Sequence, residues 1–285
     1  EGFDVCYLDV DKAGAIKLES LEDALDDNVI LVTLMTVNNE TGMIQPVVPA
    51  YDIVKTYNKE HGTNIVFHTD AVQAFGKMNL RNVPFDIITI SGHKVHAPKG
   101  VGAMYMKSGL KLPTFIPGGG QESGYRSGTE NTHGIAGLGL ATELAYDNLT
   151  EKQELLATLN NRLREGIISE LDDIIVNGTT EMGFEISDYG KRCPSVLNIS
   201  FLGSRGEVIL HTLEQEEIYV STGSACSSHK NSDSHVLAAM GLGHKEIEGA
   251  IRFSISEFNT LEEMDEAAAK VSEAVKRFRR LGSFR

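Results

Sequence analysis

Short apolar runs alternate with helical segments through the first half of the chain. The runs cover residues 29–37, 64–69 and 85–90, and a helical stretch over residues 47–61 separates the first two. Runs of this length, bounded by polar turns, are typical of buried parallel strands joined by crossover helices. The alternation predicts an α/β domain built on a mostly parallel sheet.

The first of these runs is apolar almost without interruption over residues 30–35. Such continuity predicts a central strand that is covered on both faces, although a buried helix has the same pattern. The β-branched residues in the run favour the strand.

The spacing changes in the second half to a long helical pattern from about Gly134 to Leu171, broken near residues 147–150. We place a domain boundary there, with a large domain at residues 1–148 and a smaller α+β domain at residues 149–285. Strands are expected at residues 196–201 and 217–220. A last helix is expected after Thr260, because Glu262 and Glu263 follow that start signal and apolar residues then recur at helical spacing.

Composition excludes several classes of partner. The chain carries 26 basic and 40 acidic side chains, a net charge of -14, which argues against nucleic-acid binding. No run approaches the about 20 apolar residues that cross a bilayer, and no secretory signal opens the chain, so we expect no membrane partner. Three widely spaced cysteines do not suit a disulfide framework, which favours a reducing cytoplasm.

Two ionisable residues follow neighbouring predicted strands. Asp70 ends one run and Lys94 comes shortly after the next. The carboxyl ends of strands form the ligand crevice of open α/β sheets, so these two side chains can meet one ligand. Taken singly, Asp70 could equally cap a helix and Lys94 could be solvated.

The segment Ser-Gly-His-Lys at residues 91–94, followed by Pro-Lys-Gly-Val-Gly at 98–102, closely resembles the cofactor-lysine segment of the class V aminotransferase family, within the fold-type I pyridoxal phosphate enzymes. The resemblance implies that Lys94 forms a Schiff base with the cofactor and that Asp70 keeps the pyridine nitrogen protonated. It also implies that Gln73 hydrogen-bonds the phenolic oxygen and that Ser91 and His93 bind the phosphate.

A glycine run at residues 118–120 leads to Arg-Ser-Gly-Thr at residues 126–129. The run is a weak signal alone, since its spacing fits neither the dinucleotide nor the P-loop pattern. Small residues, an arginine and hydroxyls do suit a phosphate. In the resembling family the threonine contacts the phosphate of the neighbouring subunit, so Thr129 implies a homodimer with shared sites.

Cys226 lies among small polar residues in the segment Ser-Thr-Gly-Ser-Ala-Cys-Ser-Ser at residues 221–228. A thiol in such surroundings can ionise and attack, unlike the usual buried cysteine. No second cysteine or histidine pair lies at zinc-like spacing, so no metal site is expected. The segment resembles the sulfur-carrying loop of the NifS and IscS branch of cysteine desulfurases, and it differs from that of the SufS branch.

Asn39 and Arg252 complete the candidate site. Asn39 follows the first predicted strand and Arg252 lies in an Ile-Arg-Phe-Ser segment. The resemblance implies that Asn39 lies near the cofactor oxygen and the substrate carboxylate. It also implies that Arg252 binds this carboxylate, and a guanidinium suits bidentate carboxylate binding. A turn residue and a surface charge remain the alternative interpretations. Cys6 and Cys193 match no family role and are expected to be structural.

The reaction implied by the resemblance converts L-cysteine to L-alanine and leaves a persulfide on Cys226, which an iron-sulfur scaffold or another sulfur acceptor then takes. A selenocysteine lyase or an aminotransferase would share Lys94 and Asp70 without needing Cys226. A third possibility is a chain that folds and dimerises without catalysis. The resemblance begins partway into the family's large domain, so we expect that a segment with a phosphate-binding turn and a ring-stacking histidine precedes Glu1.

Overall fold

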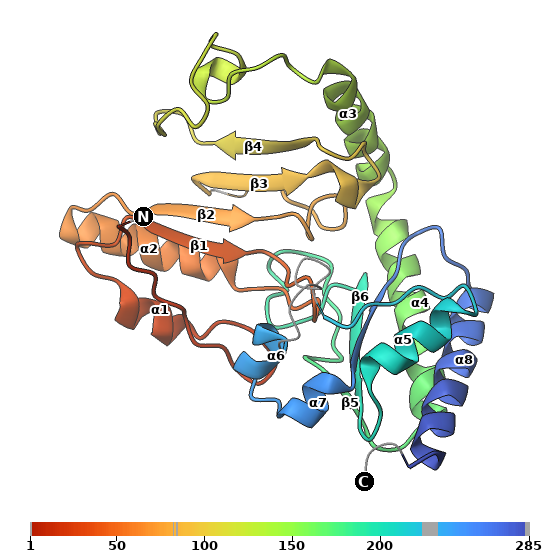
Figure 1. Ribbon diagram of the computed structural model, residues 1–285. Coiled ribbons are helices and arrows are strands. Elements are labelled where there is room, and N and C mark those ends of the chain that lie inside the picture. Colours follow the sequence, from red (N-terminus) through yellow and green to blue (C-terminus); the bar gives the residue numbers. More distant parts are fainter. Residues whose placement is uncertain (1, 82, 84, 224–232, 283–285) are drawn as a thin grey trace.

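The computed structural model describes residues 2–81, 83, 85–223 and 233–282. It contains two sheets that lie side by side, each covered by its own helices (Figure 1). None of the helices in these ranges is both long and apolar enough to span a membrane. The division at residues 148 and 149 remains our interpretation of the domain organisation.

The first sheet has the order β1-β2-β3-β4, formed by β1 (Leu31–Met35), β2 (Val66–Asp70), β3 (Ile87–Ser91) and β4 (Gly102–Met106). Strands β1, β2 and β3 are parallel and β4 is antiparallel to β3. The predicted crossover helix is present as α2 (Val47–His61), between β1 and β2. The α/β class with a mostly parallel sheet is therefore confirmed.

Helices α1 (Leu18–Ala24) and α2 cover one face of this sheet. Three buried aromatic rings pack between sheet and helix, with Tyr51 of α2 edge-on to Phe67 at 5.7 Å and to Phe85 at 5.6 Å between ring centroids. Edge-to-face packing of this kind adds to the stabilisation from burial alone.

The prediction that residues 30–35 form a strand is confirmed, but its expected coverage on both faces is wrong. β1 lies at the edge of the described sheet, and its side chains alternate between exposed and buried. Val32 and Leu34 face the core, whereas Leu31 is 49% and Met35 is 38% exposed on the opposite face. The reason is that α1 and α2 pack on the same face, so only alternate residues are covered.

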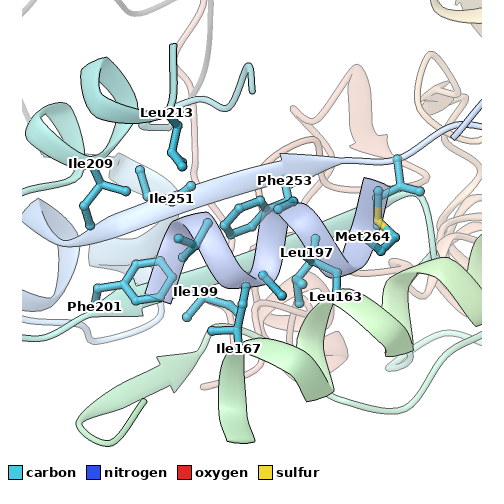
Figure 2. Close-up of a cluster of buried hydrophobic side chains, with 14 of the residues drawn as sticks. Leu163, Ile167, Leu197, Ile199, Phe201, Ile209, Leu213, Ile251, Phe253 and Met264 are labelled. Atoms are coloured by element: carbon cyan, nitrogen blue, oxygen red, sulfur yellow. The ribbon is translucent and has the colours of Figure 1, made fainter. Parts of the chain in front are cut away.

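The second sheet is antiparallel, with β6 (Val196–Phe201) between β5 (Ile174–Val176) and β7 (Ala250–Ser254). Helices α4 (Leu149–Glu170), α5 (Gly206–Glu214) and α8 (Leu261–Arg280) bury one core against it (Figure 2). Leu197, Ile199 and Phe201 alternate along β6 and supply the sheet's side of this core.

The helix ends in this half follow the sequence signals. Helix α3 (Thr132–Tyr146) ends where the break was predicted, and α4 begins after Asn148, which adopts a left-handed conformation at φ 51°. Helix α8 begins with a capping box, in which Thr260 accepts from the Glu263 amide and Glu263 accepts from the Thr260 amide.

One expectation is wrong in this half of the chain, and another is wrong at its start. Residues 217–220 form no strand, and the ladder contact there is one isolated bridge between Ser221 and Arg252. The sequence reading also missed β4, β5 and β7. Cys193 is buried as a structural cysteine should be, but Cys6 is exposed, because residues 3–9 form no regular element that could cover it.

The remaining elements are short. They are α6 (His235–Ala239), α7 (His244–Glu248), and two 3-10 turns, η1 (Gly92–Val95) and η2 (Glu122–Gly124). Of these, η1 directly follows β3 and contains Lys94, one of the predicted site residues.

Replacing Leu163 by alanine should destabilise the second core. Leu163 is 2% exposed among the helix and sheet residues of Figure 2, and leucine-to-alanine changes at such sites cost about 2–5 kcal/mol of unfolding free energy. Leu155, on the same helix but 38% exposed, is the matched control, and its alanine variant should lose less than about 1 kcal/mol. Urea denaturation measures both, and equal losses would contradict this packing.

Candidate active site

The carboxyl ends of β1, β2 and β3 place three candidate residues at one edge of the first sheet (Figure 1). Asp70 and Ser91 are the last residues of β2 and β3, and Asn39 follows β1 by four residues. The parallel ladder continues past the strands, since the Thr36 amide donates to the Asp70 carbonyl at 2.8 Å. This edge is where open α/β sheets bind ligands.

Lys94 is held by the tight turn η1. The Gly92 amide donates to the Val101 carbonyl at 2.9 Å, and the Ala97 amide donates to the Gly92 carbonyl at 3.1 Å. A β-carbon on Gly92 would come within 2.9 Å of the Val101 carbonyl oxygen, so the turn requires glycine. The close packing fixes the backbone beneath Lys94, while its side chain is exposed.

Lys94 lines a cavity of about 120 Å³ between the two sheets. Gly76, Lys77 and Lys94 come from the first half of the chain, and Ile255 and Glu257 come from the segment after β7. The cavity is therefore formed by both halves of the chain. Of the predicted site residues that the structure describes, Lys94 lines it and the others do not.

Asp70 presents an exposed carboxylate whose Oδ1 accepts from the Val72 amide at 2.9 Å. This bond fixes the side chain at the strand end and leaves Oδ2 available to a ligand. A carboxylate held in this way can pair with a protonated ring nitrogen.

His68, two residues before Asp70, links three strands through its ring nitrogens. Nδ1 lies 2.6 Å from Thr33 Oγ1 and Nε2 lies 3.0 Å from Thr89 Oγ1. Burial lowers the pKa of His68 below its usual 6.5, and the nearby Asp70 carboxylate opposes that shift. The sequence reading missed this residue, although strand alternation places it on the same face as Asp70.

The predicted phosphate ligands are near each other at the start of η1, with Ser91 Oγ 2.7 Å from His93 Nδ1. Gln73 lies in the turn that follows β2 and accepts a hydrogen bond from Lys77. Thr129 is exposed in the segment before α3, and no hydrogen bond within the described residues joins it to the other candidates.

Arg252 reaches the strand-end edge from the second sheet. Its Nη1 donates to the Asn39 carbonyl at 3.2 Å, across 213 residues of sequence. The structure thus brings Arg252 to the backbone of Asn39, and the roles of both residues in binding a cofactor or substrate stay predictions.

Glu40 contacts the second half of the chain, and the sequence alone did not point to it. It is 2% exposed, and its Oε2 accepts from Ser234 Oγ at 2.6 Å. The Glu40 carbonyl also accepts from Asn198 Nδ2 at 3.1 Å. Cys226 lies outside the described residues; Ser221, before it, pairs with Arg252, and Ser234, after it, pairs with Glu40.

The donor set suits pyridoxal phosphate. The strand ends carry the Lys94 amine, which suits the aldehyde of that cofactor, and the Asp70 carboxylate, which suits its ring nitrogen. The Gln73 amide suits the phenolic oxygen, and Ser91 with His93 suits the phosphate. Across the described ranges, no group of three or more histidine, cysteine, aspartate or glutamate side chains is placed to hold a metal ion.

The fold and the grouping of these residues define an α/β protein with a candidate ligand-binding edge at the carboxyl ends of its parallel strands. Residues 1–266 match the family described as aminotransferase class V. The chain is 41% identical over 283 residues to the cysteine desulfurase IscS of Clostridium botulinum, an alignment that covers 99% of this chain and 68% of that protein. The chain belongs to the class V aminotransferase family.

Solved structures agree with this assignment. A protein titled NifS-like protein has a TM-score of 0.83 and 37% identity, covering 97% of this chain and 69% of that one. A structure titled SspA in complex with cysteine has a TM-score of 0.70 and 33% identity, covering 91% of this chain and 68% of that one.

The His68 interaction predicts a pH-dependent component of stability. The unfolded chain keeps the usual pKa near 6.5, whereas burial lowers the folded value. As pH falls below about 6.5, the unfolded state binds the proton first, so the free energy of unfolding decreases. His68→Gln removes this component, and urea titrations between about pH 7.5 and 5 should show a shallower decrease than wild type. Equal slopes would rule out a depressed His68 pKa.

The Glu40 to Ser234 bond predicts coupling between the two halves. Glu40→Ala and Ser234→Ala should each cost about 1–3 kcal/mol of unfolding free energy, because each leaves a partner without its hydrogen bond. The double variant should lose less than the sum of the two, by roughly 0.5–3 kcal/mol. Ser169→Ala, at an exposed helix hydroxyl, is the control. Additive losses would show that the contact contributes nothing.

Proposed function

We propose that this chain carries the catalytic machinery of a cysteine desulfurase, which converts L-cysteine to L-alanine and retains the sulfur on Cys226. The observation that carries the proposal is the Arg252 to Asn39 contact, which brings a guanidinium to the strand-end edge that holds Asp70 and precedes Lys94. We assign carboxylate binding to that guanidinium. The names of the relatives support it, and one neighbour is titled as a complex with cysteine.

Pyridoxal phosphate is the cofactor that we propose. Lys94 would hold it covalently, Asp70 would face its ring nitrogen and Gln73 would face its phenolic oxygen, with Ser91 and His93 at the phosphate. When bound, the cofactor supplies an electron sink for the substrate's bonding electrons. Thr129 would complete the phosphate site of a second subunit, which makes the active form a homodimer.

Arg252 and Asn39 are the residues that we propose bind the substrate. A guanidinium suits a carboxylate because it can donate two parallel hydrogen bonds. The Nη1 bond to the Asn39 carbonyl already orients the Arg252 side chain at the sheet edge, which reduces the entropy that substrate binding would otherwise cost.

We assign proton transfer to Lys94 and sulfur transfer to Cys226. Lys94, which lines the cavity, would move protons to and from the substrate carbons. The Cys226 thiolate would attack the substrate sulfur, so that a sulfur-sulfur bond forms as the carbon-sulfur bond breaks and alanine leaves. The persulfide would then pass to an iron-sulfur scaffold or another sulfur acceptor in the cytoplasm.

Two substitutions separate the roles of Lys94 and Cys226. Lys94→Ala should abolish borohydride-trapped attachment of the cofactor at this position and lower alanine formation by about 100-fold or more. Cys226→Ala should retain the attachment, measured by peptide mass spectrometry, but lose sulfide release in the presence of a thiol reductant. Cys6→Ser changes an exposed cysteine outside the site and is the control. Sulfide release at the wild-type rate by Cys226→Ala would contradict the role of that residue.

A further inference from the structure

Lys77 makes a direct contact with a proposed cofactor ligand. Its Nζ donates to Gln73 Oε1 at 3.2 Å, one helical turn away along the segment after β2. Lys77 is half-buried, and it lines the same cavity as Lys94. Neither composition nor spacing distinguished this lysine from a solvated surface residue.

The contact decides which way the Gln73 amide points. An ammonium group has three donors and no acceptor, so the atom that faces it must be the amide oxygen. Once Oε1 is engaged by Lys77, the amide nitrogen is directed elsewhere with both of its donors available. A glutamine held this way can donate to an anionic oxygen but presents no acceptor to repel it.

Lys77 is itself held in place. Its carbonyl accepts from Gln153 Nε2 of α4 at 2.9 Å, and the same amide donates to the Phe184 carbonyl at 2.8 Å. Gln153 is buried, and both bonds are partly shielded from solvent. The lysine backbone is therefore anchored to the helix that opens the second half of the chain.

Burial and nearby charges act on the pKa of the Lys77 amine in both directions. Burial, the largest cause, lowers the pKa of Lys77 below its usual value, and Lys94 acts in the same direction. Cys193 and Glu257 act in the opposite direction. His96 and Lys152 also line the cavity. Because a hydrogen bond to Gln73 stabilises the amine where water is partly excluded, Lys77 is a built part of the cavity wall.

We propose that Lys77 is a positioning residue, which locks the Gln73 side chain so that its amide nitrogen donates to the phenolic oxygen of bound pyridoxal phosphate. This inference rests on the proposed function for the identity of the cofactor. The Lys77 to Gln73 contact does not depend on the cofactor and can be tested without it.

The first test uses the cofactor-free chain. The ¹⁵N-labelled side-chain amide of Gln73, assigned with Gln73→Asn, should shift as pH is raised and Lys77 loses its proton. The midpoint should lie below the usual lysine value of about 10.4. Lys77→Met should abolish that shift and Lys77→Arg, which keeps the donor, should hold the amide in one state. Lys152→Met, which removes another amine from the cavity, should leave the shift intact.

The second test uses the cofactor. Lys77→Met should weaken pyridoxal phosphate binding by about fivefold to tenfold, the effect of one hydrogen bond, and Lys77→Arg should restore most of it. A cofactor analogue without the phenolic hydroxyl should bind wild type and Lys77→Met alike. Lys152→Met again serves as the control.

The outcomes separate the two proposals. An amide that titrates identically in wild type and Lys77→Met overturns the role of Lys77, whatever the cofactor does. An equal loss of affinity for the cofactor and its analogue also overturns it, because Lys77 would then act on the fold rather than through Gln73. Failure of wild type to bind pyridoxal phosphate would count against the proposed function, while the amide titration still decides the contact.

Discussion

The Asn39 and Glu40 pair is the junction on which the arrangement of the two halves depends. Side chains from β6, β7 and the start of α6 converge on it, through Asn198, Arg252 and Ser234. A buried carboxylate is costly to desolvate, and the short bond from Ser234 offsets part of that cost. Because the pair directly follows the strand-end edge, the second half of the chain is positioned against the residues that would bind the ligand.

The loop that holds this pair is itself tightly built. Asn38 Oδ1 accepts from the amides of Glu40 at 2.9 Å and Thr41 at 3.0 Å. Gly42 follows with φ at 77°, and a β-carbon there would approach Arg192 Cγ at 2.9 Å. Arg192 is fully buried and donates to Asn160 Oδ1 at 3.1 Å, and burial lowers its pKa to about 10. The loop is therefore held by its own Asn38 side chain and packs against Arg192 of the second half.

The parts of this molecule that could be predicted are those governed by local pattern. Helix α2 matches its predicted range, and the meeting of Asp70 with the segment of Lys94 follows from parallel strands sharing an edge. The exposure of one face of β1 could not be predicted, because an apolar run does not show whether helices cover one face of the strand or both. The bond from Ser234 to Glu40 spans 194 residues, and no spacing rule reports such a contact.

A second contact between the halves lies on the other side of Lys94. His96, two residues on, has its ring 5.0 Å from that of Phe258, and its Nε2 lies 3.9 Å from Glu257 Oε2. His96 adopts a left-handed conformation at φ 64°, which ends the turn η1 and directs the chain toward this contact. His96 and Glu257 line the same cavity as Lys94, so this contact between the two halves helps to set the space beside the lysine.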